Sequence, residues 1–137
     1  MLTNILLHVI ILKKNRRSVM DVLMIVNIIV SLGVSLGGYC MIKYAKSAID
    51  FSIGFRTKRA MSSEEAWHFA NDRCGKAWSI IGIFSFVFTI VSVFLANGDA
   101  SGAAFQLAIL LFQIAVIVAS IIVTEYQLKR KFSDDLK

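Results

Sequence analysis

The sequence contains no proline, and only 18% of its 137 residues are charged, whereas soluble domains have about 25% charged residues. Charged residues are nearly absent from three long stretches, and hydrophobic residues make up 57% of the chain. A soluble protein of this length has too little interior to bury three such stretches. The composition therefore argues against a soluble enzyme, a disordered regulator and a disulfide-rich secreted domain. It favours a small integral membrane protein.

Residues that hold metals or form disulfides are scarce. The two cysteines, Cys40 and Cys74, have no CxxC or Cys/His spacing, and a structural zinc site needs about four ligands. The two histidines, His8 and His68, have no companion ligand in the sequence. We expect the cysteines to be small packing residues, and we predict no metal and no cofactor.

Catalytic motifs are also missing. The sequence has no Ser/His/Asp constellation, no Gly-rich phosphate loop and no HExxH zinc-protease motif. Glu64 and Glu65 are adjacent, so on a helix they point to different sides and make a poor acid–base pair. We predict no catalytic residues and expect that the chain is not an enzyme.

Three segments are long enough to cross a bilayer as helices, which requires about 20 mostly apolar residues. They are residues 22–42, 77–96 and 103–124. Strands in lipid would leave edge groups without hydrogen bonds, so helices are favoured despite the many β-branched residues. The short link at residues 97–102 makes the last two spans an antiparallel hairpin. The predicted fold is an all-α membrane protein with three transmembrane helices.

Residues 1–19 are predicted to form an N-terminal arm ahead of a membrane domain at residues 20–137. The apolar run at residues 2–12 is about half the length needed to span. It lacks the basic start and the small-residue cleavage site of a signal peptide. Two interpretations stay open: a short helix in the membrane interface, or a misassigned translation start, with the protein beginning at Met20.

The orientation is predicted from lysine and arginine, which are enriched in cytoplasmic loops. With the N-terminus outside, the inside holds seven basic residues in the loop at residues 43–76 and four in the C-terminal tail, against four in the arm. We therefore expect the loop and the C-terminus to be cytoplasmic. The net charge is +6. We expect the basic residues behind it to set the orientation and to contact anionic lipid rather than nucleic acid.

Each span carries a stripe of small and polar residues, the kind that join helices in lipid. The residues that we predict to pack between helices are Asn27, Gly33, Gly37, Gly82, Gln106 and Gln113. The GxxxG pair in the first span serves either a homodimer or a contact within the chain. Polar residues inside spans also line substrate paths, so a ligand cavity is the alternative. No span interior contains a charged residue, which argues against a pump.

The loop at residues 43–76 contains a predicted amphipathic cytoplasmic helix. Ser62 is expected to cap its start, with Glu65 three residues on, as in a capping box. We expect the helix to continue into the second span or to bend at Gly75. Its shared face is predicted from three-four spacing and comprises Trp67, Ala70, Asn71, Cys74 and Trp78.

Ahead of that helix, a glycine is followed by three basic residues. Gly54 permits a tight turn or a close backbone approach. Arg56 has five donors suited to a carboxylate or phosphate, and together with Lys58 and Arg59 it suits a lipid head group or an acidic partner. The alternative is that these charges only set orientation and that Arg56 pairs with carboxylates of its own loop.

The loop resembles the signature of the SdpI family, small bacterial membrane proteins named for immunity to a secreted killing peptide. The resemblance covers about residues 20–125. It rests on Ile53-Gly54-Phe55-Arg56-Thr57, Met61-Ser62, Glu65 with Trp67 and Ala70, and Gly75-Lys76 with Trp78. Asp50 stands where the family usually has asparagine, which adds a negative charge near Arg56. Short family members have the same layout of one span, a motif loop and a two-span hairpin.

The resemblance implies a protein of the bacterial cytoplasmic membrane that protects against a membrane-active peptide toxin or bacteriocin. The implied partners are membrane lipids and an amphipathic toxin peptide. The residues implied for the motif or for partner binding are Asp50, Gly54, Arg56, Thr57, Glu65, Trp67, Asn71 and Lys76. Arg56, Trp67 and Asn71 are expected to hold the loop in one shape, with Arg56 paired to Asp50 or Glu65.

Two alternative functions remain at this stage. One is a membrane sensor or tether that recruits a cytoplasmic regulator through the basic loop. The other is a small transporter, which requires a water-filled cavity along Asn27, Gln106 and Gln113.

Overall fold

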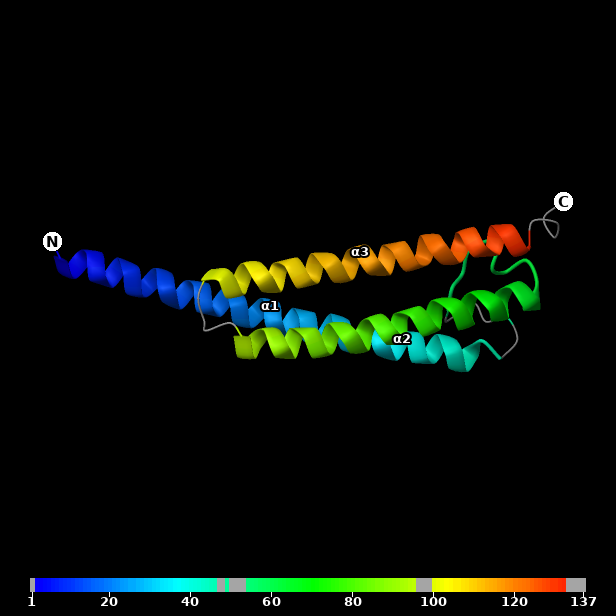
Figure 1. The fold of residues 1–137 in the computed structure, drawn as a ribbon, viewed down its shortest axis with the longest axis horizontal. Helices are drawn as coiled ribbons and strands as arrows, with labels where there is room; N and C mark the ends of the chain where they lie inside the picture. Colours follow the sequence, from blue (N-terminus) through cyan, green and yellow to red (C-terminus); the bar gives the residue numbers. More distant parts are fainter. Residues whose placement is uncertain (1, 47–48, 50–53, 96–99, 133–137) are drawn as a thin grey trace.

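Three long helices run up, down and up in the computed structural model of the protein (Figure 1). The structure describes residues 2–46, 49, 54–95 and 100–132. Helix α1 is Leu2–Tyr44, α2 is Glu64–Leu95 and α3 is Ala100–Lys131. Each helix is long and apolar enough to cross a membrane. The predicted all-α fold with three spans is therefore confirmed, and the described ranges contain no strand.

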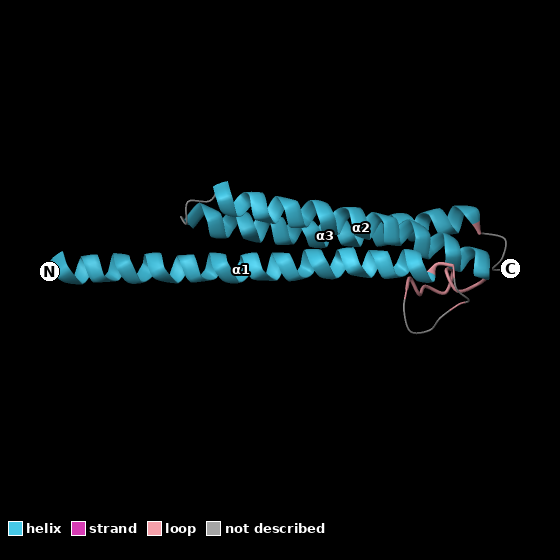
Figure 2. Ribbon diagram, turned by 90° about the horizontal axis from the view of Figure 1, so that it is seen from below, coloured by secondary structure: helices cyan, strands magenta, loops and turns pink. Residues whose placement is uncertain are grey.

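The two ends of the bundle carry different connections. At the hairpin end α2 is followed by α3, and at the loop end the described residues 54–63, which lead into α2, lie beside the last turns of α3 (Figures 1 and 2). Helix α2 makes its most extensive contacts with α1 and fewer with α3. All three helices therefore pack on one another, and the loop end is where the chain's long connection meets the bundle.

Helix α1 is much longer than a bilayer needs. Its 43 residues correspond to about 65 Å, against about 30 Å for the hydrocarbon core. The N-terminal part extends past α2 and α3 in both views (Figures 1 and 2). From Leu2 onward the arm continues α1 without a break, and its large apolar side chains between Ile5 and Leu12 are 44–62% exposed. Its place in the membrane interface stays a prediction.

The predicted loop helix does not form an amphipathic element of its own but continues into the second span, one of the two outcomes that the sequence left open. Residues 64–76 are the first turns of α2, which continues through Gly75 into the apolar part of the helix. Gly75 instead serves a close helix contact, because a Cβ added there would lie 2.7 Å from the carbonyl oxygen of Gly38. The sequence was consistent with continuation or with a bend at Gly75. The close packing of α1 against Gly75 goes with the continuous helix.

The start of α2 is capped one residue later than predicted. Ser63 is the capping residue, since its Oγ accepts a hydrogen bond of 3.2 Å from the backbone N–H of Ala66. The Ser62 hydroxyl instead donates to the carbonyl of Arg59 at 2.8 Å. Glu64 and Glu65 therefore occupy the first turn, where their negative charges interact favourably with the positive end of the helix dipole.

Close approach of α1 and α2 depends on glycines. A Cβ added to Gly82 would lie 2.6 Å from the backbone N of Ser35 and 2.7 Å from the carbonyl oxygen of Ser31. A Cβ added to Gly38 would lie 2.6 Å from the carbonyl oxygen of Gly75. Since real Cβ atoms do not approach backbone atoms so closely, any larger residue at these positions would push the two helices apart.

The GxxxG pair of the first span behaves differently at its two positions. A Cβ on Gly37 would be in ordinary contact with the Trp78 ring, at 3.6 Å, whereas one on Gly33 would meet no atom within 4 Å. Gly33 therefore makes no packing contact within the chain, because it lies on the exposed outer face of α1, and its alternative role in a homodimer stays a prediction. Gly38 and Gly75, which were not predicted as a pair, make the close contact instead.

A hydrogen-bonded series of polar side chains joins the three helices inside the bundle. Asn27 Nδ2 donates to Gln106 Oε1 at 2.8 Å, and Gln106 Nε2 donates to Ser92 Oγ at 2.8 Å. Gln113 Nε2 donates to Ser31 Oγ at 2.9 Å. All five side chains are at most 2% exposed. The structure thus places Asn27, Gln106 and Gln113 at helix–helix contacts, where each amide finds a partner on another helix.

Candidate functional site

The signature segment, defined here as residues 54–63, folds back against α2 and α3 at the loop end (Figure 2). Phe55 and Ala60 are its buried residues, and they join a cluster contributed by all three helices. The other members of the cluster are Met41, Ala66, Ala70, Cys74, Leu128 and Phe132. Burial of this apolar surface fixes the segment to the bundle.

Asn71 holds the start of the segment. Its Oδ1 accepts a hydrogen bond of 2.8 Å from the backbone N–H of Phe55, and its Nδ2 donates to the carbonyl of Trp67 at 3.0 Å. Asn71 and Trp67 are both fully buried. A buried backbone N–H without a partner costs about 1–3 kcal/mol, so this amide decides whether the segment can pack here.

Gly54 is required by the same contact. It has a φ of +116°, a conformation that residues with a Cβ rarely adopt. A Cβ at this position would collide with Asn71 Oδ1 and lie 3.1 Å from the Trp67 ring. The glycine therefore allows both the turn and the close approach of the backbone to α2, the two alternatives that the sequence left open.

Glu125 on α3 holds the other end of the segment. Its Oε2 accepts a hydrogen bond of 2.8 Å from Thr57 Oγ1, and its Oε1 accepts one of 2.9 Å from Arg59 Nη1. Thr57 Oγ1 in turn accepts the backbone N–H of Ala60 at 3.1 Å. The Glu125 carboxylate thus holds two residues of the signature segment that are distant from Glu125 in sequence. Sequence analysis did not single out Glu125, since no local pattern indicates its partners.

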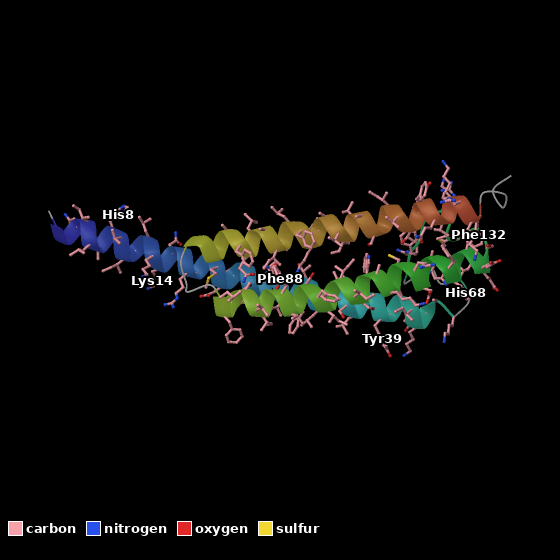
Figure 3. The ribbon with its side chains drawn as sticks, in the orientation of Figure 1. His8, Lys14, Tyr39, His68, Phe88 and Phe132 are labelled. Atoms are coloured by element: carbon pink, nitrogen blue, oxygen red, sulfur yellow. The ribbon has the colours of Figure 1, made fainter. Side chains whose placement is uncertain are left out.

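Aromatic and cationic side chains cover the cluster at the loop end. Phe69 and Phe132 pack edge to face, with ring centroids 5.9 Å apart, and Figure 3 shows Phe132 at the end of α3. The Lys131 ammonium lies 4.8 Å from the centroid of the Phe69 ring and Arg73 lies 5.7 Å from it. The contact of Lys131 with Phe69 joins the last turn of α3 to α2, whereas Arg73 and Phe69 both lie on α2.

Six of the eight residues proposed from the sequence divide into two groups. Gly54, Thr57, Trp67 and Asn71 come together in the contacts described above. Glu65 and Lys76 do not join them: Glu65 is paired at 3.4 Å with Lys131, and Lys76 is paired at 2.7 Å with Asp72 on the exposed side of α2.

Arg56 occupies a third kind of position. Its side chain is exposed, as is that of Lys58, and it is not without an interaction partner. Asp50, one of its two predicted partners, lies outside the described residues. The predicted pairing of Arg56 therefore stays a prediction. What the described residues do show is a segment that is buried on one side and basic on the other.

No group of three or more potential metal ligands occurs among the described residues. The chemistry available is hydrogen bonding and charge: a rigid segment, held by an amide and a carboxylate, presents cations at the end of a membrane bundle. Fold and site together define a multi-pass membrane protein with an ordered basic connection between its first two spans.

Comparison with known proteins identifies the family. The model of the SdpI/YfhL protein family matches residues 46–124, more than half of the chain, so the chain belongs to this family. The match covers the signature segment, α2 and most of α3. Searches of curated proteins and of solved structures find no match to the chain.

Proposed function

We propose that the protein protects a bacterial cell against a membrane-active peptide toxin or bacteriocin. The observation that carries this proposal is the family match over residues 46–124, which includes the whole signature segment. The partners in this proposal are membrane lipids and an amphipathic peptide, and no catalytic step is involved.

The physical basis is competition for the peptide within the membrane. A toxin that kills by assembling in the bilayer is inactive when a membrane helix bundle binds it singly. The apolar outer faces of the three helices offer contact surface at the depth of the hydrocarbon core. In our proposal the loop end lies in the cytoplasm and the N-terminus outside, as the distribution of lysine and arginine favours.

The tether alternative has one observation in its favour. Arg56 and Lys58 are exposed on a segment that Asn71 and Glu125 hold in place, and an ordered basic surface suits an acidic cytoplasmic partner. The transporter alternative has less support, since the space between Ser31, Gly82 and Gln113 is too small to hold water.

The test is survival of a sensitive bacterial host that expresses the chain, challenged with a panel of purified peptide bacteriocins. We expect the inhibitory concentration of at least one peptide to rise. Arg56→Ala should lower the raised inhibitory concentration about tenfold, because the variant loses a charge-assisted hydrogen bond of the guanidinium group. Such a bond contributes about 1.5–3 kcal/mol. Lys58→Ala, an equally exposed cation two residues away, is the matched control and should retain protection.

Both variants must reach the same level in isolated membranes, as measured by immunoblot. Full sensitivity of the expressing host to every peptide would contradict the protective function. Unchanged protection by Arg56→Ala at equal expression would remove this residue from the mechanism. Capture of a cytoplasmic protein by the wild type but not by Arg56→Ala, without any protection, would support the tether instead.

A further inference from the structure

A pocket of about 370 Å³ lies at the loop end, between the end of α1 and the first three turns of α2. Its α1 side is formed by Ile42 and by Ala45 and Lys46, which follow the helix, and its α2 side by His68 and Asp72. Figure 3 shows His68 on α2 at this end of the bundle. Sites for small ligands have volumes of about 300–1,000 Å³, so the pocket is large enough for a ligand of that class.

The pocket opens just beyond the closest contact of α1 with α2. A Cβ added to Gly75 would lie 2.7 Å from the carbonyl oxygen of Gly38 and 2.9 Å from Ile42 Cγ1, so no space is left between the helices at that level. Asp72 and His68 lie about one and two turns further towards the start of α2. The tight glycine contact therefore holds both sides of the pocket in place.

The depth of the pocket is that of lipid head groups. The first span is predicted to end at Ile42 and the second to begin at Ala77. At 1.5 Å per residue, Lys46 lies about 6 Å beyond the first span and Asp72 about 7 Å beyond the second. Head groups occupy about 5–7 Å on each side of the hydrocarbon core. The two charged side chains are therefore level with the head groups, and Ile42 is level with the ends of the acyl chains.

The two sides of the pocket carry charges of opposite sign. Lys46 supplies an ammonium from the α1 side, and Asp72 supplies a carboxylate from the α2 side. Asp72 is paired with Lys76 at 2.7 Å through Oδ2, but 41% of its side chain stays exposed. Since a carboxylate has about four acceptor positions, Asp72 can accept a further hydrogen bond from a donor in the pocket.

A zwitterionic head group with a primary amine matches this arrangement. Its phosphate diester is the anion for Lys46, and its ammonium group offers N–H donors to Asp72. Phosphatidylglycerol has the phosphate but would bring a negative charge to Asp72 without a cation beside it. Phosphatidylcholine has both charges, but its trimethylammonium group has no N–H to donate.

We propose that this pocket binds the head group of phosphatidylethanolamine, with the phosphate at Lys46, the ammonium at Asp72 and the glycerol against Ile42 and Ala45. The inference concerns a lipid site that the protective function neither requires nor supplies, and it holds for either orientation of the chain in the membrane. It goes beyond a general attraction of basic residues to anionic lipid, because the acidic side chain decides which lipid binds.

Native mass spectrometry of the detergent-solubilised protein tests the amine side. Phosphatidylethanolamine, phosphatidylcholine and phosphatidylglycerol with identical acyl chains are each titrated against the full chain. We expect phosphatidylethanolamine to bind about three- to tenfold more tightly than the other two, as for one charge-assisted hydrogen bond in a partly exposed site. Asp72→Asn should remove this preference. Glu64→Gln, which changes an exposed carboxylate of α2 outside the pocket, is the matched control and should retain it.

Lys46→Gln tests the phosphate side. It should weaken the binding of all three lipids by a similar factor, because they share the phosphate diester. Lys43→Gln changes an exposed lysine on α1 that does not line the pocket, so it should leave the affinities nearly unchanged.

Three outcomes would overturn the proposal. The first is equal binding of the three lipids or a preference for phosphatidylglycerol, which would mean that positive charge alone attracts the lipid. The second is a preference for phosphatidylethanolamine that survives Asp72→Asn. The third is displacement of the bound lipid by an excess of soluble glycerophosphoethanolamine, which would assign the pocket to a water-soluble ligand.

Discussion

Replacing Gly82 by valine is expected to lower the melting temperature of the detergent-solubilised protein by about 10 °C. The added Cβ would lie within 2.7 Å of backbone atoms of Ser31 and Ser35, and backbone atoms cannot rotate away as a flexible side chain can. Overpacking of this kind costs about 1–3 kcal/mol, and we expect the upper end because two helix backbones must separate. In a chain of this size about 3 kcal/mol corresponds to about 10 °C.

Gly33→Val is the matched control on α1. It introduces the same side chain, but no atom lies within 4 Å of the position. Valine has a slightly higher helix propensity than glycine, so the stability should change by no more than about 0.5 kcal/mol. Equal melting temperatures for the two variants would show that α1 and α2 do not cross at Gly82.

Asn71→Leu is expected to release the signature segment. Leucine cannot accept the hydrogen bond from the Phe55 N–H, and leaving that group buried and unpaired costs about 2 kcal/mol. The population of the detached segment should then rise about thirtyfold. Trypsin cleavage after Arg59, followed by mass spectrometry in detergent, should accelerate by a similar factor when opening is fast relative to cleavage.

The neighbouring position provides the comparison. Asp72→Leu makes a similar change in size and polarity, but it removes only the exposed pair with Lys76, which is worth at most about 0.5 kcal/mol. We expect the cleavage rate after Arg59 to change no more than about twofold. If Asn71→Leu and Asp72→Leu are cleaved at the same rate, the Asn71 amide does not hold the segment.

The three spans could be predicted from the sequence because hydropathy and length are local properties. The roles of Gly54 and Asn71 were also within reach. Gly54 indicated a tight turn or a close backbone approach, and the resemblance to the SdpI family implied that Asn71 helps to hold the loop in one shape. These predictions needed no knowledge of which helix lies beside which.

The contacts between helices could not be predicted in the same way. Glu125 and its partners Thr57 and Arg59 are 68 and 66 residues apart in sequence, and no spacing rule connects them. Likewise, Gly33 and Gly38 look equally suitable for close packing, yet only Gly38 faces α2. The rotation of each helix about its axis decides such cases, and it is set by packing across the whole bundle.

Topology is the central claim, because our proposal places the signature segment in the cytoplasm and the helices across the membrane. We would introduce a single thiol at Lys58→Cys or at Asp99→Cys, after replacing Cys40 and Cys74, and treat intact cells with a membrane-impermeant maleimide. The account predicts labelling at position 99 in intact cells and at position 58 only after permeabilisation. Labelling at position 58 from the external medium, or recovery of the chain in the aqueous fraction without detergent, would contradict it.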